Sequence, residues 1–144
     1  MSVHDLPHLI DVRFDDDGLP VVTVVFDLTP AQVDGALHAL RTVREARFAL
    51  TQLTTDEALA LRELTSLVDE YAVIVGADAN ARIESSVARL GVLRGALAQF
   101  SQGEHPEREG DSAAHPTVMA LLAAIEDLHA EAVRAALQGA ATRC

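Results

Sequence analysis

Two side chains with metal-binding chemistry lie close together near the C-terminus, where Glu126 precedes His129 by three residues on a predicted helix. Two such Glu-x-x-His motifs, with one glutamate from each of two further helices, hold the dimetal centres of carboxylate-bridged helix bundles. This chain contains one motif, so a homodimer would have to supply the second. Glu70 is our candidate for an additional ligand, with Glu63 and Glu84 as alternatives. The simpler interpretation is a boundary Glu and His whose tips lie in water.

Arg82 and Arg89 are candidates for binding an anionic ligand, because their seven-residue spacing would place them on one face of a helix. The alternative is that they pair with the chain's own carboxylates. The chain has 11 Arg and no Lys against 22 Asp and Glu, which gives a formal net charge of −11. This surplus of acid favours the pairing interpretation. It also argues against nucleic acid or an anionic membrane as the main partner, because both would repel the protein.

The remaining histidines and an acidic run have simpler interpretations than metal binding. His4 and His8 precede the first predicted strand, where chains are usually mobile. His105 and His115 lie in a predicted polar connection. The run Asp15–Asp17 brings three carboxylates together. The twelfth position counted from Asp15 is Phe26, however, where an EF-hand loop needs a glutamate. We expect a solvated turn there.

Covalent and phosphate chemistry lack their usual motifs. The only cysteine is the terminal Cys144, and the sequence has neither a Gly-x-Ser-x-Gly elbow nor a Gly-rich phosphate loop with its lysine. We therefore expect no catalytic residues and no cofactor. The single cysteine provides no disulfide framework, and no uninterrupted apolar run is long enough for a signal peptide or a membrane helix. A cytoplasmic protein follows as the expectation.

A β-hairpin over residues 8–28 is expected to open the fold. Its first strand alternates apolar and polar residues, and Asp15–Gly18 has the composition of a tight turn. The second strand is apolar on both faces, one of which carries Val21, Thr23 and Val25. Because such a strand should not face water and a two-stranded ribbon is marginal alone, we expect the chain's own helices or another subunit to cover that face.

Helices are expected to follow the hairpin. Thr29 and Thr54 each open a capping box with a Gln or Glu three residues later, which predicts one helix over about 30–50 and another from residue 55. The side of the first helix that carries His38 is predicted to be a solvated charged face.

The segment after residue 55 allows several interpretations. Its apolar stripe keeps helical spacing to residue 100, which predicts either one helix over about 55–101 or two helices broken near Gly76. A short strand at 71–76 is the alternative. A mobile acidic loop over 102–115 and a helix over about 116–138, closed by a glycine, complete the prediction.

Together these elements predict one helix-dominated α+β domain over residues 1–144, a β-hairpin followed by three or four helices. A continuous helix over 55–101 would be about 70 Å long at 1.5 Å per residue, so its apolar stripe would need a partner chain. We therefore expect a homodimer that also binds another protein in a regulatory or assembly role. The alternative is a metal- or small-ligand-binding helical protein with its site between helices at the dimer interface. The interface is expected at Val22, Val24, Phe26, Val68, Tyr71, Val75, Ile83, Leu90 and Leu97.

The negative charge is unevenly distributed along the chain. Residues 1–34 contain seven acids and one Arg, a net charge of −6, and residues 102–144 contain seven acids and three Arg, a net charge of −4. Residues 35–101 contain eight acids and seven Arg, a net charge of −1. We expect subunits to meet in this nearly balanced middle, where self-repulsion is weakest.

Overall fold

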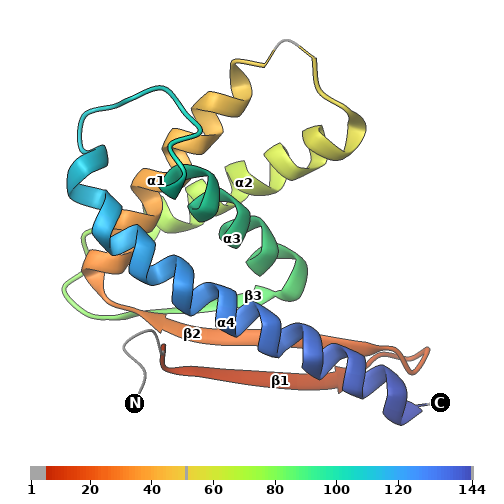
Figure 1. The fold of residues 1–144 in the computed structure, drawn as a ribbon. Coiled ribbons are helices and arrows are strands. Elements are labelled where there is room, and N and C mark those ends of the chain that lie inside the picture. The colour runs from red at the N-terminus through yellow and green to blue at the C-terminus, as the bar shows by residue number, and fades with distance from the viewer. Residues whose placement is uncertain (1–5, 51, 144) are drawn as a thin grey trace.

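The computed structural model describes residues 6–50 and 52–143. Its elements follow the order β1 (His8–Phe14), β2 (Pro20–Leu28), α1 (Pro30–Phe48), α2 (Thr55–Ile74), β3 (Ala81–Ser86), α3 (Val87–Ser101) and α4 (Asp111–Arg143). The strands form one antiparallel sheet in the order β1-β2-β3, and the helices lie on one side of it (Figure 1). The fold is α+β and dominated by helices, as predicted.

The predicted hairpin is confirmed, because β1 and β2 pair over the whole length of β1. In the turn, the carboxylate of Asp15 accepts hydrogen bonds from the backbone N–H groups of Asp17 (3.0 Å) and Leu19 (2.9 Å). Gly18 has a φ of +79°, a conformation that residues with side chains rarely adopt. The side chain of Asp15 therefore stabilises the turn of the hairpin.

The third strand was not predicted. α2 ends at Ile74, and the chain enters β3 only at residue 81, so the predicted continuous helix over 55–101 and the alternative strand at 71–76 are both wrong. The stripe that suggested a helix ran from Ala79 to Ile83 and Val87 in steps of four residues. Of these three residues only Ile83 lies within β3, because Ala79 precedes the strand and Val87 begins α3. The stripe alone could not distinguish a helix from a strand.

Both predicted capping boxes are confirmed. Thr29 and Gln32 exchange hydrogen bonds at the start of α1, and Thr54 and Glu57 do the same at the start of α2, with distances of 2.8 to 3.2 Å. The bonds from the backbone and the side chain of Thr54 hold the pKa of Glu57 below its ordinary value. These caps fix the entry of both helices.

The C-terminal helix is longer than predicted at both ends. α4 begins at Asp111 instead of residue 116, which leaves a connection of residues 102–110, and it continues through Gly139 to Arg143. A Cβ atom added at Gly139 would lie 3.2 Å from the Cβ of Pro20. This glycine therefore does not close the helix; it lets α4 pass close to the hairpin.

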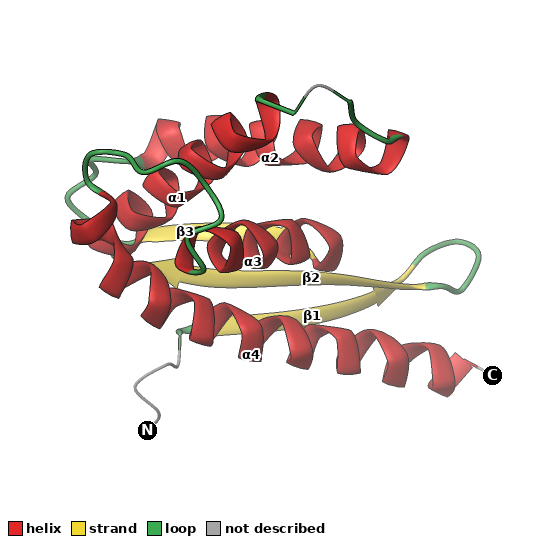
Figure 2. Cartoon of the chain, turned by 45° about the horizontal axis from the view of Figure 1, so that its top comes forward, coloured by secondary structure: helices red, strands yellow, loops and turns green. Residues whose placement is uncertain are grey.

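The core lies between the sheet and the helices. α3 and α4 pack on the sheet, and α2 packs on α1 and α3 (Figure 2). The residues predicted to meet a second subunit mostly belong to this core: apart from the half-buried Val75, the structure buries Val22, Val24, Phe26, Val68, Tyr71, Ile83, Leu90 and Leu97 within one chain. That assignment of the interface is corrected, because the apolar stripes of strand and helices find each other inside the same molecule. None of the described helices is both long and apolar enough to cross a membrane.

Candidate functional site

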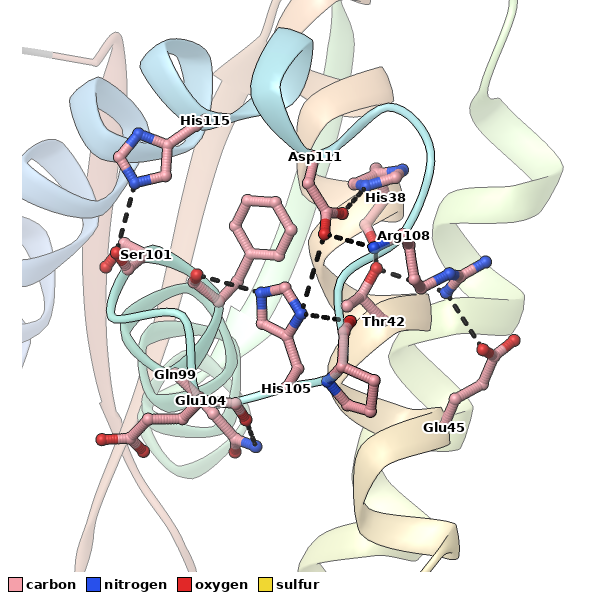
Figure 3. Close-up of polar contacts among 12 residues, drawn as sticks. His38, Thr42, Glu45, Gln99, Ser101, Glu104, His105, Arg108, Asp111 and His115 are labelled. Atoms are coloured by element: carbon pink, nitrogen blue, oxygen red, sulfur yellow. Dashed lines mark hydrogen bonds and ion pairs between the residues drawn. The ribbon is translucent and has the colours of Figure 1, made fainter.

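A polar cluster joins α1, the connection 102–110 and the start of α4 (Figure 3). We call it the Asp111 cluster, and its members are His38, Thr42, Glu45, Phe100, His105, Arg108 and Asp111. At its centre, Nε2 of His38 lies 2.7 Å from Oδ1 of Asp111. Both side chains are largely buried, at 23% and 16% exposure. This hydrogen bond ties the first residue of α4 to the middle of α1.

The second carboxylate oxygen of Asp111 is also engaged. Oδ2 accepts the backbone N–H of Arg108 at 2.8 Å and lies 3.8 Å from Nδ1 of His105. Burial by itself raises the pKa of the Asp111 carboxyl. The hydrogen bonds from His38 and from the Arg108 backbone, with the charges of His105 and His38, outweigh it and hold the pKa below its ordinary value. The cluster is therefore built around an ionised carboxylate.

His105 locks the connection onto α3. Its ring stacks on Phe100 with centroids 5.0 Å apart and planes 5° from parallel. Its nitrogens lie 2.9 Å from the carbonyl oxygen of Pro106 and 3.3 Å from that of Phe100. Carbonyl oxygens only accept, so a ring nitrogen that carries a proton is the donor in either contact. His115 makes a similar contact one turn into α4, with Nε2 3.2 Å from the carbonyl oxygen of Ser101.

Arg108 closes the other side of the cluster. One of its guanidinium nitrogens lies 3.2 Å from Oε2 of Glu45 and donates to the hydroxyl of Thr42 at 3.3 Å. The Thr42 hydroxyl in turn donates to the carbonyl oxygen of His38 at 2.8 Å. The connection is thus bound to α1 by an ion pair and by a charge-assisted hydrogen bond.

Two shallow clefts flank the cluster. The first, of about 350 Å³, is lined mainly by small residues of α1 and α4 beside His38, including Gly35 and Ala114. The second, of about 300 Å³, lies over Phe100 and His115. Both volumes lie at the lower end of the range of small-molecule sites, about 300–1,000 Å³, but both clefts are open to solvent, whereas such sites bury most of the ligand surface.

The geometry of the Asp111 cluster suits a structural clamp, which holds the connection 102–110 and the start of α4 against α1, better than a catalytic centre. A nucleophilic mechanism needs a hydroxyl or thiol bonded to a general base. Within the described part of the chain, the Thr42 and Ser101 hydroxyls both donate to backbone carbonyls instead. Each polar side chain of the cluster contacts another group of the same chain, so the arrangement fixes the connection and the start of α4.

Sequence reasoning missed this cluster. The sequence pattern predicts a solvated face around His38 and a mobile loop over residues 102–115, whereas the structure half-buries His38 and gives the connection specific contacts. One local signal was present: Gly110-Asp111-Ser112 has the composition of a helix start, with an acid at the positive end of the helix dipole. Pro116 drew the predicted start five residues too far along the chain.

The predicted metal ligands are not brought together within one chain. Glu126 and His129 lie on α4, whereas Glu70 lies on α2 and pairs with Arg89. Burial, and then the charge of Arg94, lowers the pKa of His129. In the residues that the structure describes, no group of three or more His, Cys, Asp or Glu side chains could hold a metal ion. A site shared between two copies stays a prediction.

The two candidate arginines for anion binding lie on different elements. Arg82 is on β3, so it does not share a helix face with Arg89 on α3. Burial opposes the charge of Arg89, but its bonds to Glu70 and Glu63 outweigh that effect and raise its pKa. Arg89 therefore follows the interpretation we favoured, pairing with the chain's own carboxylates. Arg82 lies 4.0 Å from Asp27 and its side chain is 76% exposed.

Of the two N-terminal histidines, His4 and His8, the structure describes only His8. His8 is the first residue of β1 and does not precede the strand; its ring contacts the carbonyl oxygen of Leu6 at 2.7 Å and Oε2 of Glu131 at 3.2 Å. The contact with Glu131 ties β1 to α4. His4 lies outside the described residues.

The side of the sheet away from the helices is open. We call it the outer sheet face, and its residues are Leu9, Asp11, Arg13, Val21, Thr23, Val25, Asp27, Arg82 and Glu84. Most of them surround a hollow of about 520 Å³. Leu9 is 64% exposed and Val21 is 49% exposed, although Val22, Val24 and Phe26 on the opposite face of β2 are buried. No helix in the described part of the chain covers this face (Figures 1 and 2).

No family model, no curated protein and no solved structure matches this chain.

Proposed function

We propose that this chain is a small acidic, cytoplasmic protein-interaction module that forms a homodimer and docks another protein on the outer sheet face. The observation that carries the proposal is the exposure of Leu9, directly opposite the half-buried Val25, and of Val21 further along β2 on that face. Strands apolar on both faces are typical of sheets covered on both sides. The described helices of this chain cover one side only.

The charges of the outer sheet face support a protein partner. Its three acids and two arginines leave a net charge of −1, on a chain whose total is −11. Four of its five charges lie in pairs within the chain, Arg13 with Asp11 at 2.8 Å and Arg82 with Asp27 at 4.0 Å. An apolar centre with a mixed, nearly neutral charged rim is the usual composition of a protein–protein interface. The polar rim would set orientation, and the valines would supply the buried area.

The contacts of the Asp111 cluster favour an interaction role over an enzymatic one. Its imidazole and carboxylate groups are bound to each other and to backbone atoms, so they stiffen the helical layer behind the sheet. A rigid scaffold lowers the entropy cost of binding on the opposite side. The regulatory or assembly role of the docked protein belongs to the same proposal.

A single charge on the outer sheet face tests the docking claim. The experiment compares proteins retained by tagged wild type, by Val21→Glu and by the matched control Val73→Glu from a lysate of the native cell. Val73 lies on α2 and is 84% exposed, so the control adds the same charge elsewhere. We expect the proteins retained by wild type to be lost with Val21→Glu and kept with Val73→Glu. Partners that bind both variants as well as wild type would refute a docking role for this face.

A further inference from the structure

β3 is an edge strand of the sheet. It pairs with β2 on one side, and on its other side the described part of the chain places no strand. The described backbone hydrogen bonds outside the sheet and the helices involve none of its residues. The unpaired N–H and C=O groups of an edge strand can pair with a strand of another molecule. Proteins that avoid such pairing shorten, bulge or cover their edges.

The side chains of β3 determine which strand fits there. Arg82 and Glu84 both point to the outer sheet face and are exposed, and Ile83 between them points to the core. No ion pair within 4.0 Å involves Glu84 in the part of the chain that the structure describes, and Arg82 approaches Asp27 only at that limit. Opposite charges directly across an antiparallel pair stabilise it, and like charges destabilise it.

Only one register of two β3 strands pairs these charges. In an antiparallel pair, two residues directly opposite each other have side chains on the same face of the sheet. When the two strands are identical, the two-fold axis therefore passes next to one residue, and that residue lies opposite its own copy. An axis at Arg82 would place Arg82 against itself, and an axis at Glu84 would place Glu84 against itself. An axis at Ile83 places Arg82 of each copy opposite Glu84 of the other, twice. β3 is therefore complementary in charge to a second copy of itself.

The other edge of the sheet fits a second copy less well. On β1, Arg13 already binds Asp11 of its own strand at 2.8 Å, so a new pair would have to replace an existing one. Two copies meeting along β1 would also bring together two segments, residues 1–34, that each carry a net charge of −6. β3 lies in the segment 35–101, whose net charge is −1. Repulsion between copies is weakest there.

We propose that β3 of one chain pairs antiparallel with β3 of a second copy, centred on Ile83, to form a continuous six-stranded sheet. This inference rests on the homodimer of the proposed function and assigns its interface. Residues 81 to 85 of one strand lie opposite residues 85 to 81 of the other. The two-fold axis is perpendicular to the sheet, so the two outer sheet faces lie side by side on the same side of the dimer. The docking surface for the partner protein is doubled in width.

Complementary charge reversals test this interface on the full chain. Arg82→Glu places a carboxylate opposite Glu84 of the other copy, and Glu84→Arg places a guanidinium opposite Arg82. We expect each variant alone to weaken the dimer at least about tenfold in sedimentation velocity, because two opposite-charge pairs become two like-charge pairs. Mixing the two variants restores pairing of opposite charges, so native mass spectrometry should show a 1:1 heterodimer. The double variant Arg82→Glu/Glu84→Arg should dimerise like wild type.

Four results would overturn the inference, and they separate it from the proposed function. If wild type forms a dimer and both single variants dimerise as tightly, the chain is a homodimer but β3 is not its interface. A dimer weakened by the β1 control Arg13→Glu, and not by Arg82→Glu, would assign the interface to the other edge. Failure of the mixed variants to form the heterodimer, while each folds by circular dichroism, would show that the charges do not face each other. A monomeric wild type would refute the proposed homodimer itself.

Discussion

The Asp111 cluster and the outer sheet face differ in where their side chains find partners. In the cluster, His38, Arg108 and His105 all contact Asp111 or groups around it, and the Asp111 side chain is 16% exposed. On the outer sheet face, Leu9 and Val21 remain exposed with no described helix over them. The cluster is complete within one chain. The apolar part of the face gains its burial only when another molecule covers it.

This difference separates stability from association. A buried polar group left without a partner costs about 1–3 kcal/mol, so substitutions in the cluster should appear in the free energy of unfolding. Substitutions at exposed positions usually change stability by less than about 0.5 kcal/mol. Those on the outer sheet face should instead appear in binding. The following changes test the separation, from the largest expected effect on stability to the smallest.

Asp111→Ala should have the largest effect on stability. It removes the acceptor of His38 and of the Arg108 backbone N–H, so we expect a loss of about 3 kcal/mol in urea unfolding. The control is Asp34→Asn, which neutralises an exposed carboxylate in the same region of the molecule. Equal stability of Asp111→Ala and wild type would mean that the cluster does not clamp α4 to α1.

Gly110→Ala should destabilise the chain by about 2 kcal/mol, because left-handed backbone alone costs a residue with a side chain about 1–2 kcal/mol and a close contact adds to that cost. Gly110 has a φ of +91°, and a Cβ atom there would lie 3.1 Å from Cε1 of His38. Gly103→Ala is the matched variant, because its φ is +72° but an added Cβ meets nothing within 4 Å. Equal losses of unfolding free energy in the two variants would show that the close approach to His38 contributes nothing.

Acid should weaken the clamp through Asp111. The folded-state pKa of this carboxyl is below its ordinary value, so its contribution to stability is fully present above about pH 4 and is lost as pH falls through the folded pKa. We expect the unfolding free energies of wild type and Asp111→Ala to converge as the pH falls below the folded-state pKa of Asp111. A constant difference between them down to about pH 2 would contradict an ionised Asp111 in the cluster.

Val21→Thr on the outer sheet face should have the smallest effect on stability, within about 0.5 kcal/mol of wild type. Threonine keeps the branched shape that strands favour and removes apolar area where Val21 is exposed. Binding of the partner protein should weaken, as measured by titration with the partner that is lost from Val21→Glu. A large loss of unfolding free energy would show that this face is structural in the single chain.

Local signals predicted the local parts of the fold. The capping boxes at Thr29 and Thr54 and the turn at Gly18 are set by residues within four positions of each other, and all three were predicted. β3 depends on pairing with β2, which is about 60 residues earlier in the chain, and only Ile83 of the apolar stripe lies within it. Pairing over such distances leaves no local trace in a single sequence.

The candidate site was less predictable for the same reason. His38 and Asp111 are 73 residues apart, so their hydrogen bond appears only once α1 and α4 are packed. The pattern did predict that β2 has two apolar faces, and the structure shows one of them open. The interface residues were misassigned because a buried stripe looks the same in sequence whether its partner is another helix of the chain or another chain.

The central claim, that copies of this chain associate, is tested most directly by size-exclusion chromatography with light scattering on the wild-type protein. At micromolar concentration we expect a particle of twice the 15.3 kDa chain mass. A single species of 15.3 kDa at that concentration would contradict the claim.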